Sequence, residues 1–354
     1  MNPVLERLKN IRLVRNLYYK MRGIFSGSRL RAAASKTVDS FGLEVNDKER
    51  VALIGDMVKT YADHGFDFSE YLCYHFQDKT EDERCEFVAD WEHLGYTCTL
   101  NDSSNDEWFD NKWFTYTKYG KFYKRGIAFC EGKQGKDEFI SLVVGKDRII
   151  VKPLNASCGR GVKIVEIPQE SEKQNELYDA LASEYNGSFV AEEVIVQVPE
   201  MAKFHPNSVN TVRVPTIRMD DEVRVIHPFM RIGQHGNCVD NAGAGGIICE
   251  VDVETGELLA TGDEMGKRFT DHPNTGEKII GFVIPEWESA KALVRELAMV
   301  LPSNRYTGWD LALTENGWVL VEANRRGQFV WQIASQTGFR REINQILKQL
   351  KKKY

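Results

Sequence analysis

Residues 308–324 read GWDLALTENGWVLVEAN. Apolar residues alternate on both sides of a Glu-Asn-Gly turn, which predicts two antiparallel strands joined in a hairpin. Asp310 opens the first strand, and Glu322 and Asn324 lie two residues apart near the end of the second, so their side chains share one face. Mg²⁺ prefers such hard oxygen ligands when it also keeps waters and phosphate oxygens. The hairpin is therefore either a magnesium site or an ordinary hairpin with a polar face, and the segments upstream decide between them.

The second informative segment, residues 149–165, reads IIVKPLNASCGRGVKIV. This pattern predicts a strand, a glycine-bearing loop and a second strand. Gly159 and Gly161 allow the backbone to approach an anion closely, and Lys152 at the strand end can contact phosphate oxygens. The segment lacks the Gly-Lys-Ser/Thr ending of a Walker A loop and does not match the dinucleotide-binding fingerprint. Taken singly, such a loop is also explained as a hairpin turn rich in small residues.

The order of these segments carries more information than either one alone. A Lys-Pro strand, a glycine loop, the segment VAEEVI (190–195) and the Asp…Glu-x-Asn hairpin resemble the ATP-grasp superfamily. The pattern is similar to those of two members of this superfamily, D-alanine–D-alanine ligase and glutathione synthetase. The middle of the chain, from SVNTVR (208–213) to VDN (239–241), resembles the sugar-transfer-associated ATP-grasp family, which is linked to surface polysaccharide biosynthesis. The resemblance covers about residues 108–335.

The resemblance implies ATP and Mg²⁺ or Mn²⁺ as cofactors and assigns roles to individual residues. Lys152 would contact the α- and β-phosphates, and the 156–162 loop would fold over them through Ser157, Gly159, Arg160 and Gly161. Lys112 would be an earlier phosphate-binding lysine, with Lys118 as its substitute. The hinge that reads the adenine edge would consist of Glu192, Glu193, Val194 and Ile195, and Glu200 would accept hydrogen bonds from the ribose. Asp310, Glu322 and Asn324 would hold the metal ion, whereas Lys112 and Glu200 also fit solvated surface charges.

Members of this superfamily phosphorylate a carboxylate with ATP and then let an amine attack the acyl phosphate. Such chemistry needs charge neutralisation and in-line positioning. Arg213 and Arg231 interrupt apolar strand patterns, so alternation can point both guanidinium groups to one face as catalytic residues. The alternative is a pair of arginines in surface ion pairs. Arg325 and Arg326 follow the metal-binding asparagine and fit either an acidic substrate or an exposed basic pair.

The composition excludes several other classes of protein. The 354 residues are 42% hydrophobic and 28% charged, as in soluble globular proteins, and they exceed one typical core. A net charge of −6 gives no general attraction for nucleic acid. The seven cysteines are odd in number and lack a CxxC pair, which indicates reduced thiols. No run of 18 apolar residues and no signal-peptide core are present, so we expect a cytoplasmic protein.

Residues 1–36 are basic, opposed only by Glu6, and their apolar residues recur at roughly helical spacing. Such a helix either lies peripherally on an anionic membrane, here the inner membrane surface, or docks on its own protein with a solvated charged face. Residues 37–105 continue with helical patterns and end at a polar break, NDSSN (101–105). Strand patterns follow from residue 148, with helical patterns at 287–301 and 340–353.

We therefore predict an α+β protein with the ATP-grasp fold, two α+β subdomains that clasp ATP, preceded by a mainly helical region. The predicted domains are residues 1–105, 106–192 and 193–354. The leading hypothesis is a carboxylate–amine ligase that joins a sugar acid and an amino acid or amine, both small-molecule substrates. The alternatives are an ATP-dependent phosphotransferase acting on a hydroxyl and a nucleotide-sensing module without catalysis. The oligomeric state stays open, and a dimer is compatible with the sequence.

Overall fold

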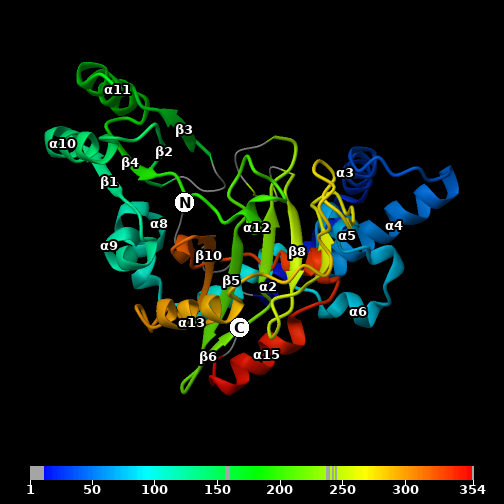
Figure 1. Cartoon of the computed structure of the whole chain (residues 1–354). Helices are drawn as coiled ribbons and strands as arrows, with labels where there is room; N and C mark the ends of the chain where they lie inside the picture. Colours follow the sequence, from blue (N-terminus) through cyan, green and yellow to red (C-terminus); the bar gives the residue numbers. More distant parts are fainter. Residues whose placement is uncertain (1–11, 156–159, 237–239, 241–242, 244, 353–354) are drawn as a thin grey trace.

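The computed structural model describes residues 12–155, 160–236, 240, 243 and 245–352. Its strands form two antiparallel sheets, one of four strands and one of seven, and helices cover both (Figure 1). This mixture of separate helical and antiparallel segments confirms the predicted α+β class. Among the described residues, no helix is both long enough and apolar enough to cross a membrane.

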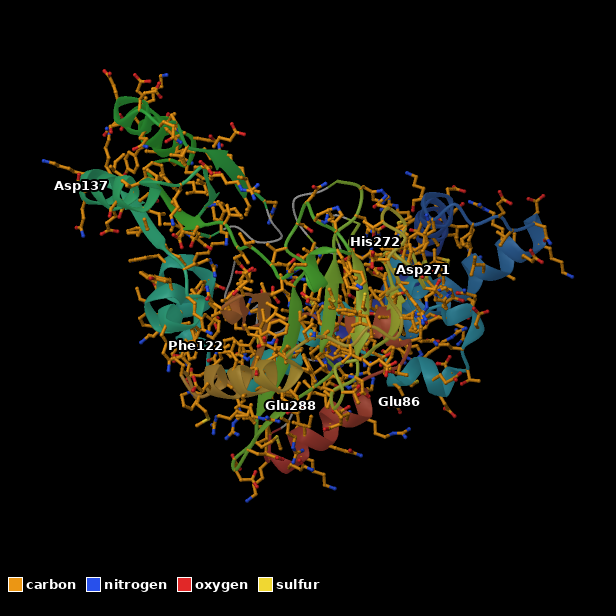
Figure 2. The ribbon with its side chains drawn as sticks, viewed as in Figure 1. Glu86, Phe122, Asp137, Asp271, His272 and Glu288 are labelled. Atoms are coloured by element: carbon orange, nitrogen blue, oxygen red, sulfur yellow. The ribbon has the colours of Figure 1, made fainter. Side chains whose placement is uncertain are left out.

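The four-stranded sheet has the order β1-β4-β2-β3, formed by Ile127–Glu131, Ser188–Glu193, Arg148–Lys152 and Lys163–Glu166. Helices α10 (Gly132–Val143) and α11 (Ser171–Glu184) pack on it through a small core of their own, which includes Phe139, Tyr178 and Phe189. Asp137 on α10 lies at the outer edge of this layer, away from the seven-stranded sheet (Figure 2). The predicted strand–loop–strand segment is thus confirmed as β2 and β3, at the edge of the smaller sheet.

The seven-stranded sheet runs in the order β11-β10-β5-β7-β8-β9, and β6 pairs with β5 beside β7. Its strands are β5 (Val212–Arg218), β6 (Val223–Val225), β7 (Phe229–Ile232), β8 (Ile247–Val251), β9 (Leu258–Gly262), β10 (Tyr306–Thr314) and β11 (Gly317–Asn324). The hairpin predicted at 308–324 is confirmed as β10 and β11. Its turn depends on Gly317, whose φ of 81° suits a residue without a Cβ.

The central strand β5 contains a proline, which lacks the N–H that an interior strand normally donates. Pro215 pairs with Gly308 of β10 on one side. On the other side β7 pairs with Val212 and Arg213, and β6 pairs with residues 216–218. Pro215 therefore lies in the gap between two ladders, where no N–H is needed. This gap explains how a central strand accommodates the proline.

Helices cover both faces of the larger sheet, so its central strands are buried along nearly their whole length. One face packs on α9 (Lys112–Tyr123) and α13 (Trp287–Ala298). The other packs on the N-terminal helices and on the C-terminal helices α14 (Trp331–Ser335) and α15 (Arg340–Gln349). The remaining helices are α2 (Arg12–Phe25), α3 (Gly27–Ser40), α4 (Asp47–His64), α5 (Phe68–Cys73), η1 (Phe76–Asp78), α6 (Glu81–Glu86), α7 (Asp90–Leu100), η2 (Ser103–Asn105), α8 (Glu107–Asp110) and α12 (Pro199–Ala202).

The N-terminal helices share a hydrophobic core with the rest of the chain. Residues from Leu30 to Leu100 pack with Ile217, Phe229 and Tyr306 of the sheet and with Trp331 and Phe339 near the C-terminus. The helical region predicted at the N-terminus is confirmed, but its core is not separate from the core of the larger sheet. The domain boundaries at 105/106 and 192/193 stay predictions.

Candidate nucleotide and metal site

The centre of the site is a buried carboxylate held by arginines from two neighbouring strands. Asp310 and Arg213 are cross-strand partners in β10 and β5. Arg213 donates two hydrogen bonds to the carboxylate of Asp310, one from Nε at 2.5 Å and one from Nη2 at 2.8 Å. Arg231 of β7 adds a further bond at 2.9 Å. The prediction that Arg213 and Arg231 share one face is confirmed, and that face is lined by Asp310.

These ion pairs set the charge state of the buried groups. Burial alone would raise the pKa of Asp310, but Arg213 and Arg231 outweigh it and lower the pKa. Burial likewise disfavours a charged Arg213, yet Asp310 raises its pKa above the usual value. Arg231 also contacts Thr211, whose hydroxyl and backbone N–H both donate to the carboxylate of Asp240. Asp310 and Arg213 are therefore both held in their charged forms, within a well hydrogen-bonded cluster.

The predicted metal ligands differ in how accessible their oxygen atoms are. A carboxylate has about four lone-pair positions. Asp310 receives the three arginine bonds and a fourth from Nδ2 of Asn324 at 3.2 Å. Asn324 therefore keeps its amide oxygen for another partner, and the Glu322 side chain is half-exposed. The set of hard oxygen donors fits Mg²⁺, but Asp310 would bind an ion only by giving up one of these four bonds.

Lys152 ends β2 and lies in a second buried ion cluster. Its Nζ lies 2.9 Å from Glu192, and Arg125 lies 2.6 Å from the same carboxylate. Burial would raise the pKa of Glu192, but Lys152 and Arg125 lower it to about 2. Glu192 therefore positions a lysine ammonium at the end of the strand that leads into the glycine loop.

Lys112 links the two sheets. It is the first residue of α9, where the Asn111 side chain caps the helix, and its backbone N–H donates to the carbonyl of Leu154, two residues after Lys152. Its Nζ lies 3.9 Å from Glu322 of β11. Burial, and then the charge of Lys152, lower the pKa of Lys112, whereas Glu322 and Glu192 oppose the shift. The charges of Lys152, the other predicted phosphate-binding lysine, and of Glu322, a predicted metal ligand, therefore both act on Lys112.

The glycine loop is described only in part, because Ser157 and Gly159 lie outside the described residues. Gly161 has φ of 72° and accepts a hydrogen bond on its carbonyl from the Tyr185 hydroxyl at 2.6 Å. Arg160 is exposed. A positive φ at Gly161 fits the need for a residue without a Cβ at the start of β3. The contact of this loop with phosphates stays a prediction.

The predicted adenine hinge connects the two sheets. Glu193 ends β4 and contacts Lys146 and the backbone N–H of Gly126, while Val194 and Ile195 follow the strand. Val198 then donates its N–H to Leu313 of β10. Glu200 is exposed on the short helix α12. The roles of these residues toward adenine and ribose stay predictions.

Arg325 has a role that the sequence did not reveal. It is buried, and it donates a fork of hydrogen bonds to Asp110 at 3.1 and 2.6 Å and lies 2.9 Å from Asp106. Arg326 is more exposed, and among the described residues its ion pair is with Asp106 alone. Asp106 and Asp110 are four residues apart, so in a helix their carboxylates lie on the same side and can bind one cation. The local sequence does not identify that cation as Arg325. Arg325 thus braces α8, the helix that ends two residues before Lys112.

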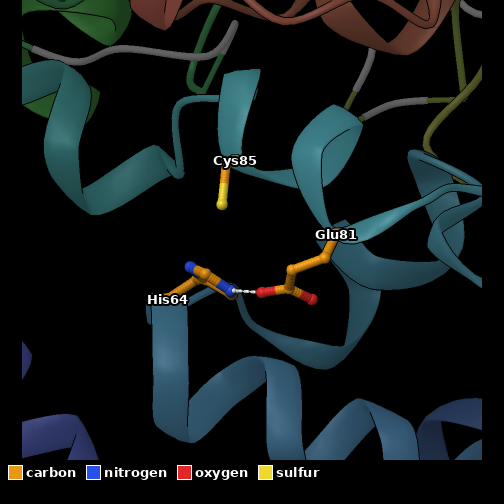
Figure 3. A group of neighbouring side chains, drawn as sticks. All are labelled: His64, Glu81 and Cys85. Atoms are coloured by element: carbon orange, nitrogen blue, oxygen red, sulfur yellow. Dashed lines mark hydrogen bonds and ion pairs between the residues drawn. The ribbon is translucent and has the colours of Figure 1, made fainter.

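A group of potential metal ligands lies far from this site. His64 at the end of α4 meets Glu81 and Cys85 of α6, with ligand atoms within 4.8 Å of one another (Figure 3). His64 Nε2 lies 2.5 Å from Glu81, so no space for an ion separates them. Burial, and then Glu81, raise the pKa of Cys85. We interpret the group as a histidine–carboxylate hydrogen bond beside a protonated thiol.

Comparison with known families identifies the fold. The profile of the sugar-transfer-associated ATP-grasp family matches residues 93–348. The chain belongs to this family. The match extends beyond the segment that carried the motifs and includes most of α7 and most of α15. It confirms the suspected superfamily and the predicted ATP-grasp fold, and it makes the chain a member of a group of ATP-binding proteins.

Solved structures of ATP-grasp enzymes are similar to this chain. D-alanine–D-alanine ligase from Helicobacter pylori is 15% identical, with 69% of this chain and 60% of that chain covered and a TM-score of 0.41. An ADP complex of purK, N5-carboxyaminoimidazole ribonucleotide synthetase, is 12% identical, with coverages of 62% and 46% and a TM-score of 0.39. The chain thus spans about half of these structures, and a search of curated sequences found no match. The family assignment rests on the profile match.

Proposed function

We propose that this ATP-grasp protein is a carboxylate–amine ligase that works through an acyl phosphate. In the first step a carboxylate oxygen attacks the γ-phosphorus of ATP and ADP leaves. In the second step an amine attacks the acyl carbon, phosphate leaves, and the amine nitrogen loses a proton. The observation that carries the proposal is the placement of Lys112 between the two sheets, with its backbone N–H on the carbonyl of Leu154 and its Nζ 3.9 Å from Glu322.

The lysines suit the binding of a polyphosphate. Both side chains are largely buried, so their charges are less screened than those of exposed lysines. Lys152 comes from the smaller sheet, and Lys112 begins a helix that packs on the larger one. A nucleotide bound between them would contact both sheets. Mg²⁺ held by Glu322 and Asn324 would neutralise charge on the phosphate oxygens.

The arginines suit the acyl phosphate. Arg213 and Arg231 are oriented by Asp310, and each is about one-tenth exposed. Guanidinium groups fixed in this way bind phosphate and carboxylate oxygens without reorganising in the transition state. Asp310 and Asp240, whose carboxylate lies 3.5 Å from Arg231, balance the charges of the two arginines. An oxyanion would therefore be bound by the fixed N–H donors of the guanidinium groups and not by an excess positive charge.

The substrate class follows from the family description and the chemistry. The link to sugar transfer favours a sugar acid as the carboxylate and an amino acid or amine as the nucleophile, within surface polysaccharide biosynthesis. A protein with this task would act in the cytoplasm, where ATP and activated sugars are available. The C–N bond and the identity of both substrates are part of the proposal.

The deciding experiment is a screen of the purified chain with Mg²⁺-ATP against pairs of uronic acids and amines, read by ADP release and product mass. We expect ADP and phosphate in amounts that depend on both an acid and an amine. Release of AMP and pyrophosphate would overturn the proposal. A stable phosphorylated hydroxyl compound formed without any amine would establish the phosphotransferase alternative instead.

The Glu322→Gln variant tests the site itself. It removes a carboxylate that is half-exposed, so the fold should be retained while turnover is lost. Glu315→Gln, in the turn of the same hairpin, is the matched control and should keep wild-type activity. Wild-type turnover by Glu322→Gln would exclude this residue from the metal site.

A further inference from the structure

Among the residues that the structure describes, helix α2 packs on the protein with only one of its faces. Tyr19 lies edge-on to Tyr61 of α4, with ring centroids 5.0 Å apart, and tilts against Trp91 at 5.7 Å. Gly23 meets Ala62 so closely that a Cβ added to the glycine would lie 2.6 Å from the alanine methyl group. The inner face of α2 is therefore fixed by an aromatic contact and a close glycine approach.

The opposite face is apolar and has no cover within the described residues. We call it the outer stripe, formed by Val14, Leu17, Tyr18, Met21 and Ile24, which are 41–75% exposed. Their spacing of three, one, three and three residues places them on one side of a helix with 100° per residue. A soluble helix normally turns such a side toward its own core. An exposed apolar row of this kind marks an interaction surface.

Basic residues flank the outer stripe and indicate what it contacts. On the helical wheel Lys20 and Arg22 lie about 100° to either side of its centre. Arg22 donates a hydrogen bond to the Tyr18 hydroxyl at 3.3 Å, so an amphipathic ring and a cation lie together at the edge. Residues 12–36 contain seven Lys or Arg and no Asp or Glu, in a chain with a net charge of −6.

We propose that the outer stripe inserts into the headgroup region of an anionic phospholipid membrane. Apolar side chains in the middle, basic side chains on both edges and tyrosine at the boundary match a helix that lies in the plane of the interface. The concentrated positive charge is complementary to anionic lipid. The inner-face contacts with Tyr61, Trp91 and Ala62 would then hold the protein body at that surface.

Cosedimentation of the whole chain with vesicles tests the proposal. We expect binding to phosphatidylcholine vesicles that contain phosphatidylglycerol, weak binding to phosphatidylcholine alone, and a decrease with added salt. The double variant Leu17→Glu/Ile24→Glu should lower the bound fraction about tenfold, because it adds charge to the inserted face. The Met299→Glu variant, at a similarly exposed apolar residue outside the stripe, should bind like the wild type.

Two further measurements test whether the substitutions change the folding or the oligomeric state of the protein. Circular dichroism and thermal melting should show the double variant folded, since both residues are exposed in the structure. Light scattering without lipid should give the same mass for wild type and variant. Equal binding to both vesicle types, or a dimer that the substitutions dissociate, would overturn the proposal. The second result would assign the stripe to contact with another copy of the chain.

Discussion

Arg325 donates two hydrogen bonds to Asp110, a residue 215 positions earlier in the chain. This contact fixes the segment that leads into α9, and therefore the position of Lys112. We expect Arg325→Ala to raise the KM for ATP about tenfold by displacing that lysine, and to lower the melting temperature. Steady-state kinetics with varied ATP will measure the first effect and calorimetry the second.

The adjacent arginine is a matched control for this prediction. Arg326 is 44% exposed, and within the described part of the chain its ion pair is with Asp106 alone. Because exposed ion pairs contribute about 0–1 kcal/mol, Arg326→Ala should leave both KM and melting temperature near their wild-type values. If the two variants behave alike, Arg325 does not brace Lys112.

Replacement of Asp310 should act on stability more than replacement of Glu322. Asp310→Asn would leave Arg213 and Arg231 buried without their main counter-charge, at a cost of about 3–5 kcal/mol. Glu322→Gln changes a half-exposed group and should cost less than about 1 kcal/mol. Urea unfolding of both variants provides the comparison. Equal stability of the two variants would contradict the view that Asp310 organises the arginines.

The Glu192 cluster predicts a loss of stability in acid. The folded-state pKa is about 2, below the value of about 4.3 expected in the unfolded chain. The folded state therefore binds fewer protons, so stability from this carboxylate is complete above about pH 5 and disappears toward pH 2. Unfolding free energies measured across this range should fall more steeply for the wild type than for Glu192→Gln. Parallel curves for the two proteins would refute the assignment.

Gly338 should not tolerate a side chain. A Cβ at this position would lie 2.0 Å from the backbone carbon of Glu86 and 2.4 Å from the backbone nitrogen of Phe87. Backbone atoms of a packed core cannot move away cheaply, so Gly338→Ala should destabilise by at least about 2 kcal/mol. Gly27→Ala has open space at the start of α3 and should be neutral or stabilising by about 0.5 kcal/mol. Denaturant midpoints of the two variants will check the contrast.

Local patterns were enough to predict the hairpin, β2, β5 and α13, because short runs of β-branched residues mark strands and apolar residues at helical spacing mark a helix. They also led to the family, since its motifs are short and ordered along the chain. The partners of Arg325 and of Glu192 were not predictable in this way. Ion pairs between residues far apart in sequence depend on how the sheets pack, and alternation within a strand holds no information about that packing.

The sequence patterns also did not predict which side chains contact Asp310. The sequence indicated an oxygen ligand and two arginines on a shared face, and both are present. The sequence did not indicate that Asp310 and the two arginines are hydrogen-bonded to each other. Register decides this point, because the pairing of β5 with β10 sets Arg213 opposite Asp310. A shift by one residue would turn these side chains to opposite faces.

The core shared by the N-terminal helices and by α14 and α15 has a consequence for how the chain folds during its synthesis on the ribosome. Leu30, Ala34 and Val38 pack in one cluster with Phe339, Ile343 and Leu347. While the ribosome is still translating the chain, the first helices have no finished surface to pack against. They must wait with apolar residues exposed until residue 347 has left the ribosome, and this interval is when a chaperone would be needed most.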